Sequence, residues 1–294
     1  MQFRYLSTLC PEYISGEIYE RKITKATPLE PVKVGEITFQ PRSCTFSKRM
    51  IEYLDRIRNF TVREDDVWMV SIPKSGTTWS QEMCWLISNN FDFDTAKSID
   101  IGKRCPYLEQ VYRYINEETK FHFEVAEKMD SPRLMQSHLP LPFLPRELWT
   151  KNPKIVYIAR DPRDVAVSRY VHSKNWFKLT VSENDFFKAF INDEVHFTPY
   201  FDHVLEFWKI RNQSNILFLT YEEMISDLKA VVLRTCNFFN KVISSDQLTQ
   251  ILKHLSFGNM KSMNIFLKNF MVVFKSASYF QKIRLVRENI NGNY

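Results

Sequence analysis

Glycine is scarce in this sequence, which contains only six glycines among its 294 residues. With no Gly/Ser-rich linker, no shift in composition and no internal repeat, the chain shows no domain boundary, and low complexity is excluded. Phenylalanine is abundant instead, with 24 residues, and 44% of the chain is hydrophobic, which is enough to bury a large core. We therefore expect residues 1–294 to form a single domain.

Cysteine is also rare, and no group of cysteines has the spacing of a metal site. The five cysteines are odd in number and scattered along the chain, at Cys10, Cys44, Cys84, Cys105 and Cys236. This pattern is typical of reduced thiols in a cytoplasmic protein, each buried for structural reasons. We therefore expect no bound metal.

Long apolar segments are missing from both ends of the sequence. Residues 1–11 contain no apolar run of roughly 7–15 residues behind a basic start, so a secretory signal is not expected. Residues 265–280 form the most apolar late stretch, but Lys268 and Lys275 interrupt it, and it is too short to cross a bilayer. These absences predict a soluble cytoplasmic protein with no membrane partner.

The formal net charge of +6 is mild and is placed unevenly along the chain. Residues 261–294 carry six basic side chains against the single acidic residue Glu288, a local charge of +5 that leaves +1 for the first 260 residues. A general basic face is therefore excluded, and we expect no nucleic-acid partner.

Hydrophobic patterns predict strands that alternate with helices. Runs rich in β-branched and aromatic residues predict four strands, at 66–72, 133–136, 154–159 and 215–220. Apolar residues at helical spacing predict helices at 46–60, 77–89, 164–175 and 222–239. This alternation favours an α/β fold with a central parallel sheet flanked by helices, in which ligands bind at the carboxyl ends of the strands.

The strongest functional signal is Ser71-Ile-Pro-Lys-Ser-Gly-Thr-Thr-Trp79, at the end of the first of these strands. A Gly-containing loop between a strand and a helix presents backbone N–H groups at the positive end of the helix dipole, and hydroxyl groups and Lys74 add to its attraction for an anion. The alternative is an ordinary strand-to-helix turn capped by Ser or Thr. The loop is P-loop-like without being a nucleotide triphosphatase loop, because it lacks the upstream glycine of Gly-x-x-x-x-Gly-Lys.

Several segments, in a fixed order, resemble those of the cytosolic sulfotransferase family. They are 71–79 for the 5′-phosphosulfate loop, 137–140 for the catalytic His-Leu-Pro block, 157–168 for the 3′-phosphate segment, and 218–223 and 254–260 for the adenine segments. The resemblance covers about residues 45–262 and leaves 263–294 as a divergent tail. It implies that 3′-phosphoadenosine 5′-phosphosulfate (PAPS) is the sulfuryl donor and that a small-molecule hydroxyl is the acceptor.

The resemblance assigns the donor-binding residues by position. They are Lys74, Ser75, Gly76, Thr77, Thr78, Trp79, Arg160, Ser168, Tyr221, Phe257 and Met260. Arg160 suits a phosphate because its guanidinium donates in a bidentate fork, although a solvated turn arginine is the alternative. Ser168 is equally consistent with a plain helix serine, and aromatic residues such as Trp79 are equally consistent with core packing.

His138 is the one histidine that the resemblance places in the chemistry. Imidazole titrates near neutrality, so His138 can take the proton of an acceptor hydroxyl as that oxygen attacks sulfur. Lys74 would stabilise the charge that grows on the leaving phosphate. The remaining histidines have no such context and are expected to be structural or surface groups: His122, His172, His196, His203 and His254.

Two features depart from the family pattern. Gln136 stands where relatives usually have a lysine two residues before the histidine, which replaces a cation with a neutral amide. No Arg-Lys-Gly-x-x-Gly block, which closes the 3′-phosphate site in relatives, follows Met260. The segment that usually forms the dimer interface would also fall in this tail. The sequence therefore leaves open whether the protein forms a homodimer.

Three functions therefore compete. The leading interpretation is a PAPS-dependent sulfotransferase acting on a phenol, sterol or other apolar alcohol, with the acceptor pocket formed by 105–125 and 141–148. The second is a catalytically weak protein that binds the nucleotide or an apolar ligand. The third, a small-molecule kinase, is disfavoured by the loop spacing. A related retinol dehydratase uses sulfation to activate an alcohol for elimination, so the product class is also open.

Overall fold

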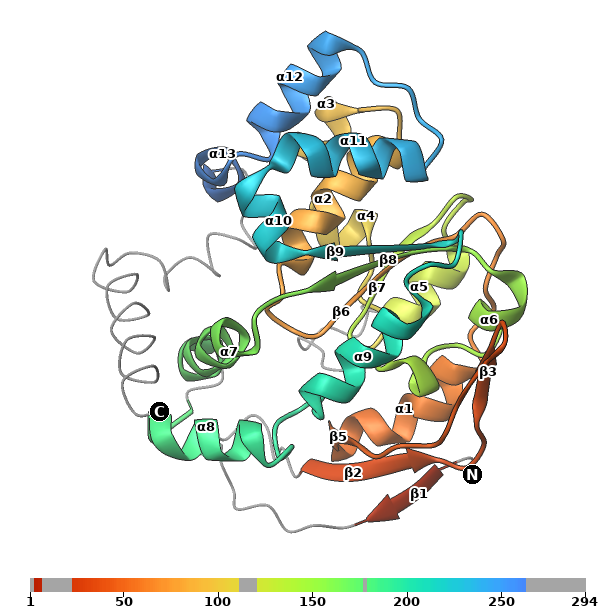
Figure 1. Ribbon diagram of the computed structural model, residues 1–294, viewed down its shortest axis with the longest axis vertical. Coiled ribbons are helices and arrows are strands. Elements are labelled where there is room, and N and C mark those ends of the chain that lie inside the picture. Colours follow the sequence, from red (N-terminus) through yellow and green to blue (C-terminus); the bar gives the residue numbers. More distant parts are fainter. Residues whose placement is uncertain (1–2, 7–22, 111–120, 177–178, 263–294) are drawn as a thin grey trace.

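A four-stranded parallel sheet lies at the centre of the computed structural model, which describes residues 3–6, 23–110, 121–176 and 179–262 (Figure 1). The strand order is β7-β6-β8-β9. The bounds are Val67–Ser71 for β6, Leu134–Ser137 for β7, Lys154–Ala159 for β8 and Ile216–Thr220 for β9. All four strands lie where the sequence predicts them, and the α/β fold with a parallel sheet is confirmed.

Helices cover both faces of this sheet and lie above and below it in Figure 1. One face packs against α1 (Lys48–Arg58), α5 (His122–Lys128), α6 (Leu148–Lys151) and α9 (Tyr200–Ile210). The other packs against α2 (Thr77–Ser88), α3 (Phe93–Ser98), α4 (Ile101–Arg104), α10 (Tyr221–Ser226), α11 (Leu228–Phe238) and α12 (Ser245–His254). Side chains alternate along each strand, so Trp68 and Val70 join one core while Val67 and Met69 join the other.

The predicted helix at 222–239 is wrong as a single element. It is divided at Asp227, whose backbone leaves helical geometry with φ −149° and ψ 77°. The Asp227 carboxylate accepts a hydrogen bond from the N–H of Ala230 and so caps α11. An aspartate that can satisfy a new helix start is therefore able to end α10 and redirect the chain.

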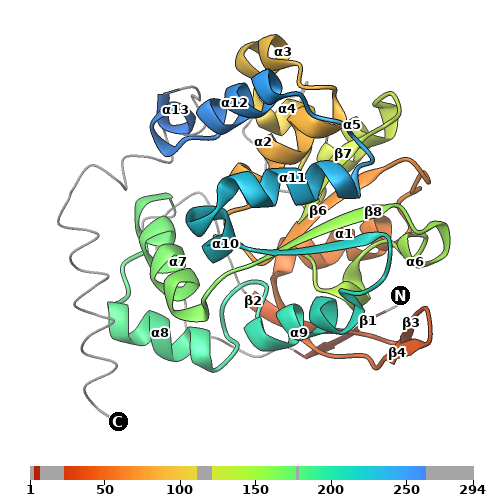
Figure 2. The same ribbon diagram turned by 45° about the horizontal axis from the view of Figure 1, so that its top comes forward.

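The remaining described helices lie near the carboxyl ends of the strands. They are α7 (Pro162–Trp176), α8 (Glu183–Ile191), α13 (Phe257–Ser262) and the short 3₁₀ turn at Leu141–Phe143. Figure 2 shows α7 continuing from the end of β8, with α8 beside it. The Asp161 carboxylate accepts from the N–H of Arg163 at the start of α7, as expected for a cap before a first-turn proline.

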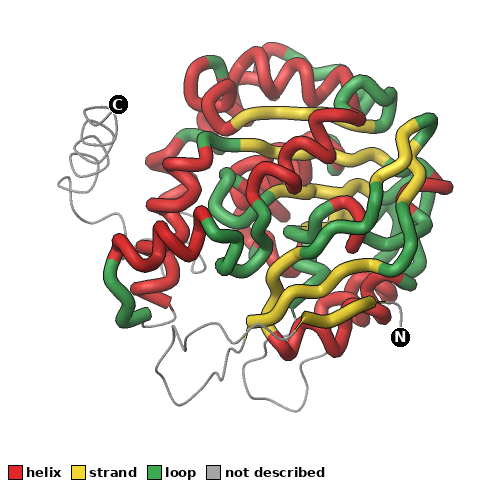
Figure 3. The backbone as a smooth tube through the Cα atoms, turned by 60° about the horizontal axis from the view of Figure 1, so that its bottom comes forward, coloured by secondary structure: helices red, strands yellow, loops and turns green. Residues whose placement is uncertain are grey.

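A second, antiparallel sheet precedes the central one and has no counterpart in the sequence-based prediction. Its strand order is β1-β2-β5, with bounds Phe3–Leu6, Ile23–Pro28 and Cys44–Ser47, and a small hairpin of β3 (Val32–Val34) and β4 (Ile37–Phe39) extends from it (Figure 3). Thr45 of β5 also pairs with the 197–198 segment, donating to the Thr198 carbonyl over 2.9 Å and accepting from the Phe197 N–H over 2.7 Å. The antiparallel sheet thereby positions the loop that carries Phe197.

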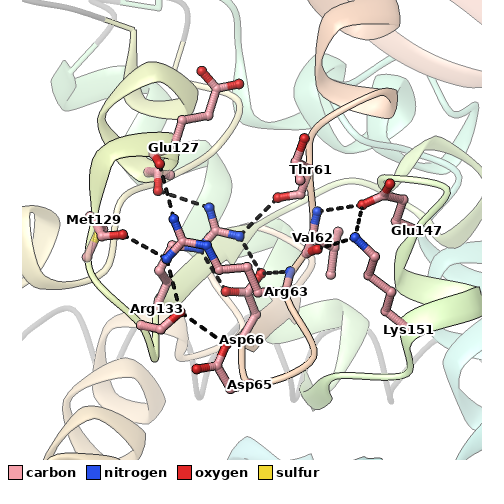
Figure 4. Close-up of polar contacts among 12 residues, drawn as sticks. Thr61, Val62, Arg63, Asp65, Asp66, Glu127, Met129, Arg133, Glu147 and Lys151 are labelled. Atoms are coloured by element: carbon pink, nitrogen blue, oxygen red, sulfur yellow. Dashed lines mark hydrogen bonds and ion pairs between the residues drawn. The ribbon is translucent and has the colours of Figure 1, made fainter.

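The amino ends of β6 and β7 are joined by a buried ion pair, shown in Figure 4. Arg133 donates to both carboxylate oxygens of Asp66, over 2.8 and 2.6 Å, and also to the carbonyls of Ala126 and Thr61. Arg63 extends the network through its backbone N–H, which donates to Asp66 over 2.7 Å. Such a bidentate pair, with its other donors satisfied, holds together the two strands that carry the site at their opposite ends.

Cys44, Cys84, Cys105 and Cys236 are free and buried, as the cysteine pattern predicts, and Cys10 lies outside the described residues. Among the described helices, none combines the length and apolar character needed to cross a bilayer. Nor do histidine, cysteine and carboxylate side chains of the described ranges gather in a group suited to a metal ion.

Candidate active site

Three of the predicted site segments lie at the carboxyl ends of β6, β7 and β8. Val70 pairs with Ser137 of β7, and Ser71 pairs with Ile158 of β8, so the three strands end side by side. The loop 72–76 follows β6, His138 follows β7 and Arg160 follows β8. Parallel pairing therefore brings together three segments that are far apart in the sequence.

The loop between β6 and α2 has a tightly constrained backbone. Lys74 has φ 76° and Gly76 has φ 98°, both in the left-handed region. A Cβ atom at Gly76 would lie 2.6 Å from Cδ2 of Tyr221, so no larger residue fits this conformation. The Ser71 and Thr77 hydroxyl oxygens lie 2.7 Å apart and close the turn.

Two buried polar atoms of this region have no partner within the described part of the chain. They are Oγ of Ser75, whose side chain is buried inside the loop, and Nε of Arg160. A buried donor without a partner is costly, and both donors lie beside the amino terminus of the 12-residue helix α2. A loop of this kind fits an anionic group such as the phosphosulfate of a nucleotide.

Arg160 links the loop to the neighbouring strand ends. Its Nη1 donates to the carbonyl of Lys74 over 3.0 Å, and its guanidinium lies 4.1 Å from the centre of the Tyr221 ring. A carboxylate oxygen of Asp164, in the first turn of α7, lies 3.8 Å from Nη2 of Arg160. The hydroxyl of Tyr200 donates to the Arg160 carbonyl. Arg160 is therefore held in place by both its backbone and its side chain.

The Lys74 ammonium gives up its proton more readily than that of an ordinary lysine. Burial, together with the positive charge of Arg160, lowers the pKa of the Lys74 ammonium to about 7. Both influences disfavour the cation in the ligand-free protein, and an anion between Lys74 and Arg160 would relieve them. The Lys74 side chain is therefore suited to binding an anionic group.

An aromatic cluster lies next to the loop. Trp79 and Tyr221 meet edge to face with ring centres 5.8 Å apart. The Trp79 indole N–H donates over 2.9 Å to the carbonyl of Leu255, which ties α2 to the predicted adenine segment 254–260. Two aromatic rings and one polar anchor at the end of a nucleotide loop suit the packing of a base.

Three predicted residues lie on adjoining helices. Ser168 is half-buried on α7, Met260 is half-buried on α13, and Phe257 at the start of α13 has 59% of its surface exposed. Met260 packs against the same core as Trp79. Thr78, the second threonine of α2, is half-buried beside the loop. The nucleotide-binding roles of these residues stay predictions.

His138 is buried between β6 and the end of β7. Its Nδ1 lies 2.6 Å from the carbonyl oxygen of Ser71, and its Nε2 lies 2.9 Å from the amide nitrogen of Gln136. Burial, reinforced by the charges of His203, Arg169 and Lys74, lowers the pKa of His138 to about 3. The imidazole is therefore neutral near neutral pH, the state that a general base needs.

Two further residues hold the His138 backbone, and sequence reasoning did not single them out for the site. The Glu109 carboxylate accepts from the N–H of His138 and from the hydroxyl of Ser137, each over 2.6 Å, and burial raises the pKa of Glu109 to about 7. His203 donates from Nε2 to the His138 carbonyl over 3.0 Å, because a carbonyl oxygen can only accept, and the Tyr157 hydroxyl lies 2.8 Å from Nδ1 of His203. No sequence signal marks Glu109, since its partners come from another strand.

The predicted acceptor segments are described only in part. Tyr107 and Phe197 face the His138 ring edge to face, with centres 5.0 and 5.7 Å away, so aromatic side chains flank the imidazole. Leu141 and Leu148 of the second predicted segment are buried in the core. Residues 111–120 of the first lie outside the described residues.

A family model described as "Sulfotransferase domain" matches residues 64–284. The match includes part of the tail, beyond the segments that carry the sequence motifs. A luciferin sulfotransferase of Photinus pyralis is 33% identical over 265 residues, covering 84% of this chain and 69% of the relative. Sulfotransferase 1E1 of Bos taurus is 35% identical over 217 residues, covering 73% and 72% of the two chains.

Solved structures with the same fold contain the desulfated nucleotide PAP. A retinol dehydratase in complex with retinol and PAP is similar with a TM-score of 0.77 and 26% identity, covering 90% of this chain and 83% of that one. A mouse sulfotransferase complexed with PAP is similar with a TM-score of 0.60 and 28% identity, covering 74% of each chain. The arrangement of strands and helices around the site is thus shared with PAP-bound proteins.

Proposed function

The chain belongs to the sulfotransferase domain family, and from this premise we propose that it transfers the sulfuryl group of PAPS to a hydroxyl of a small apolar acceptor. One observation carries the proposal: the phosphate-type loop, Arg160 and a neutral His138 converge at one edge of the sheet. The nucleotide and the base can therefore serve one reaction centre.

The donor end of the site suits PAPS. The backbone N–H groups of loop 74–78 and the buried hydroxyl of Ser75 would hold the 5′-phosphosulfate, while Arg160 and Ser168 would hold the 3′-phosphate. Arg160 has a donor to spare, because its Nε has no partner in the described residues. Trp79 and Tyr221 would pack against adenine, with Phe257 and Met260 closing its far side.

The chemistry requires alignment and a proton acceptor. When bound, PAPS supplies the sulfuryl group and a phosphate leaving group. His138 would take the hydroxyl proton at Nε2, since its Nδ1 is engaged by the Ser71 carbonyl, and the Gln136 amide that lies 2.9 Å from Nε2 would have to give way to the acceptor hydroxyl. Lys74 would stabilise charge growing on the leaving phosphate, and the buried setting would strengthen that attraction.

The acceptor class follows from what surrounds His138. Tyr107 and Phe197 provide apolar ring surface at the base, which favours a phenol, sterol or other apolar alcohol. The solved retinol dehydratase holds retinol or androsterone in its complexes, so both an ester and an elimination product are consistent with this site. The free buried cysteines support a cytoplasmic setting for the reaction.

A second candidate is a catalytically weak nucleotide-binding protein. Gln136, a neutral amide in place of the usual lysine, and the missing late Arg-Lys-Gly block favour it. Losing a transition-state donor commonly costs about a hundredfold in turnover, whereas ground-state binding can survive.

The test combines transfer and binding on a single pair of variants. His138→Ala should lower the rate of radiolabelled sulfuryl transfer at least about a hundredfold while calorimetry shows PAP binding within about twofold of wild type. His172→Ala serves as the matched control, because it makes the same change at a histidine of α7. It should keep both the transfer rate and the affinity for PAP. Binding by the wild type without transfer to phenols, sterols or retinoids would favour the second candidate, and near-normal transfer by His138→Ala would remove the histidine from the mechanism.

A further inference from the structure

Arg169 is a buried arginine that the proposed reaction does not use. It lies on α7, directly after Ser168, and only 7% of its surface is exposed. Its Nη2 donates to the backbone carbonyl of His196, whereas its buried Nη1 has no partner in the described part of the chain. A guanidinium carries its charge throughout the ordinary pH range, and buried charges in proteins are normally paired. The described residues thus leave a donor and a charge of Arg169 unmatched.

The groups that act on the Arg169 guanidinium include no carboxylate of the described residues. Burial lowers the pKa of Arg169 to about 10, and the two groups that act in the opposite direction are the Cys44 thiol and the Tyr107 phenol. Burial and the charge of Glu206 raise the pKa of Cys44, so this thiol is itself neutral near pH 7. Arg169 therefore stays positively charged at pH 7, and an anion that reached it would relieve the cost of burying that charge.

Arg169 lies on the same side of the candidate site as the aromatic rings around His138. The carbonyl to which it donates belongs to the residue before Phe197, whose ring centre is 5.7 Å from that of His138. The charge of Arg169 also acts on His138 and on Tyr107, the second ring that flanks the imidazole. The guanidinium is therefore close to the part of the site that we assign to the acceptor.

The cations of the donor end are separate from Arg169. Burial and the charge of Arg160 lower the pKa of Lys74, and Arg169 is not among the groups that act on it. Lys74 and Arg160 are both assigned to the phosphates of the nucleotide. The unmatched charge of Arg169 is thus placed to meet a different anion.

We propose that Arg169 binds a carboxylate of the acceptor, so that the preferred acceptor is a phenol or other apolar alcohol that carries this anion away from the reacting hydroxyl. The inference rests on the proposed function, since it defines the acceptor of that reaction more narrowly. The free Nη1 would donate to a carboxylate oxygen, and such charge-assisted bonds are about twice as strong as neutral ones. Tyr107 and Phe197 would contact the apolar part of the same molecule.

The first test measures acceptor binding and needs no turnover. Calorimetry on the full chain saturated with PAP compares para-hydroxybenzoate, para-hydroxyphenylacetate and para-hydroxyphenylpropanoate with their primary amides. The three acids differ in the distance between the hydroxyl and the carboxylate, which covers different positions of the guanidinium. At least one acid should bind at least about tenfold more tightly than its amide, the gain expected for a hydrogen bond to a charged group.

Two substitutions separate the charge of Arg169 from its hydrogen bond. Arg169→Gln keeps a donor for the His196 carbonyl but removes the charge, so the preference for the acid should fall to about twofold or less. Arg169→Lys keeps the charge without the planar fork and should retain part of the preference. The readout is the ratio of the two affinities, because a general loss of native protein affects acid and amide alike.

Arg234→Gln is the matched control. Arg234 lies on α11, on the opposite face of the sheet from α9, and its Nη2 is 3.1 Å from a carboxylate oxygen of Glu223. The substitution removes the same charge outside the candidate site. It should leave the ratio of acid to amide affinity at the wild-type value.

The second test repeats the comparison during turnover with PAPS. The ratio of kcat/KM for the acid to that for its amide should fall at least about tenfold in Arg169→Gln, mainly through a higher KM for the acid, because the lost contact is made in the ground state as well. If Arg169 instead stabilised the reacting sulfuryl group, Arg169→Gln would lower transfer to acid and amide equally.

The proposal fails if no acid of the series binds to the wild type more tightly than its amide, or if Arg169→Gln leaves that preference unchanged. An equal loss of transfer to both probes would overturn it as well. A wild type that transfers no sulfuryl group to any acceptor would instead count against the proposed function, while the calorimetric ratio would still decide whether Arg169 binds a carboxylate.

Discussion

At the scale of single residues, the site depends on backbone conformations that few side chains adopt. Gly76 is held at φ 98° with Tyr221 filling the space where a Cβ would lie, and Lys74 is held at φ 76° with its carbonyl bonded to Arg160. Left-handed backbone at a lysine costs on the order of 1 kcal/mol, so the surrounding contacts must hold it. This conformation keeps the Lys74 carbonyl within hydrogen-bond reach of Arg160.

The pKa of Lys74 predicts how nucleotide affinity depends on pH. In the free protein this pKa is about 7, and the phosphates of a bound nucleotide raise it, so the complex holds more protons than the free protein above pH 7. Affinity for PAP should therefore be constant below about pH 7 and fall by up to about tenfold per pH unit above it. Calorimetry in buffers of different ionisation enthalpy should detect the proton taken up.

Lys74→Arg provides the control for this effect. A guanidinium stays charged throughout this range, so the variant should bind PAP with a flat pH profile between 7 and about 9. An equally flat profile in the wild type would show that Lys74 is fully protonated before the nucleotide arrives.

At the scale of elements, α2 connects the phosphate-type loop to the rest of the protein. Glu82 on this helix accepts from Arg104 of α4 over 2.7 Å and lies 2.8 Å from Nε2 of His254 of α12, all three side chains being buried. Trp79, one turn earlier, bonds to Leu255. The helix that begins at the nucleotide loop is thus attached to the segment expected to contact adenine.

Two buried arginine pairs at opposite ends of the fold allow a matched comparison. Glu82→Gln and Asp66→Asn each leave a buried arginine without its counter-charge, so each should lower the free energy of unfolding by about 3 kcal/mol in urea denaturation. Only Glu82→Gln should also weaken PAP binding, because Asp66 lies at the amino ends of the strands. Equal loss of PAP affinity in both variants would contradict a specific role for the α2–α12 attachment.

Elements defined by local sequence were predictable, whereas those defined by a partner were not. The central strands are continuous apolar runs, and the loop motif and its helix lie within one short segment, so residues 66–89 could be placed from sequence. Strands β2 to β5 are short and half-polar, and their register depends on pairs such as Ala26 with Cys44. The break at Asp227 was missed because apolar spacing continues through it.

The same distinction holds within the candidate site. Lys74, His138 and Arg160 each follow a strand that could be recognised, so parallel pairing was enough to predict that they meet. Glu109 contacts residues from another segment, and a carboxylate without a motif gives no sign of its partners. Its role becomes visible only through hydrogen bonds that join distant parts of the chain.

At the scale of the whole molecule, nucleotide binding should stabilise the fold. The site draws on β6, β7 and β8 together, so a ligand there binds the native state and not the unfolded chain. PAP at about 100 times its Kd should raise the free energy of unfolding by about 2.7 kcal/mol, visible as a higher Tm in thermal denaturation. ATP with magnesium at the same concentration should give a much smaller shift. The reverse order would favour the kinase interpretation, and no shift with either would argue against a nucleotide site.

The position of the Arg133–Asp66 pair affects which parts of this protein can be substituted during evolution. This pair lies at one end of the strands and the candidate site lies at the other. Side chains beside the reactive end, such as Tyr107 and Phe197, can be exchanged for others without disturbing this ion pair. Evolution and protein engineering alike can therefore vary the acceptor while inheriting an intact scaffold.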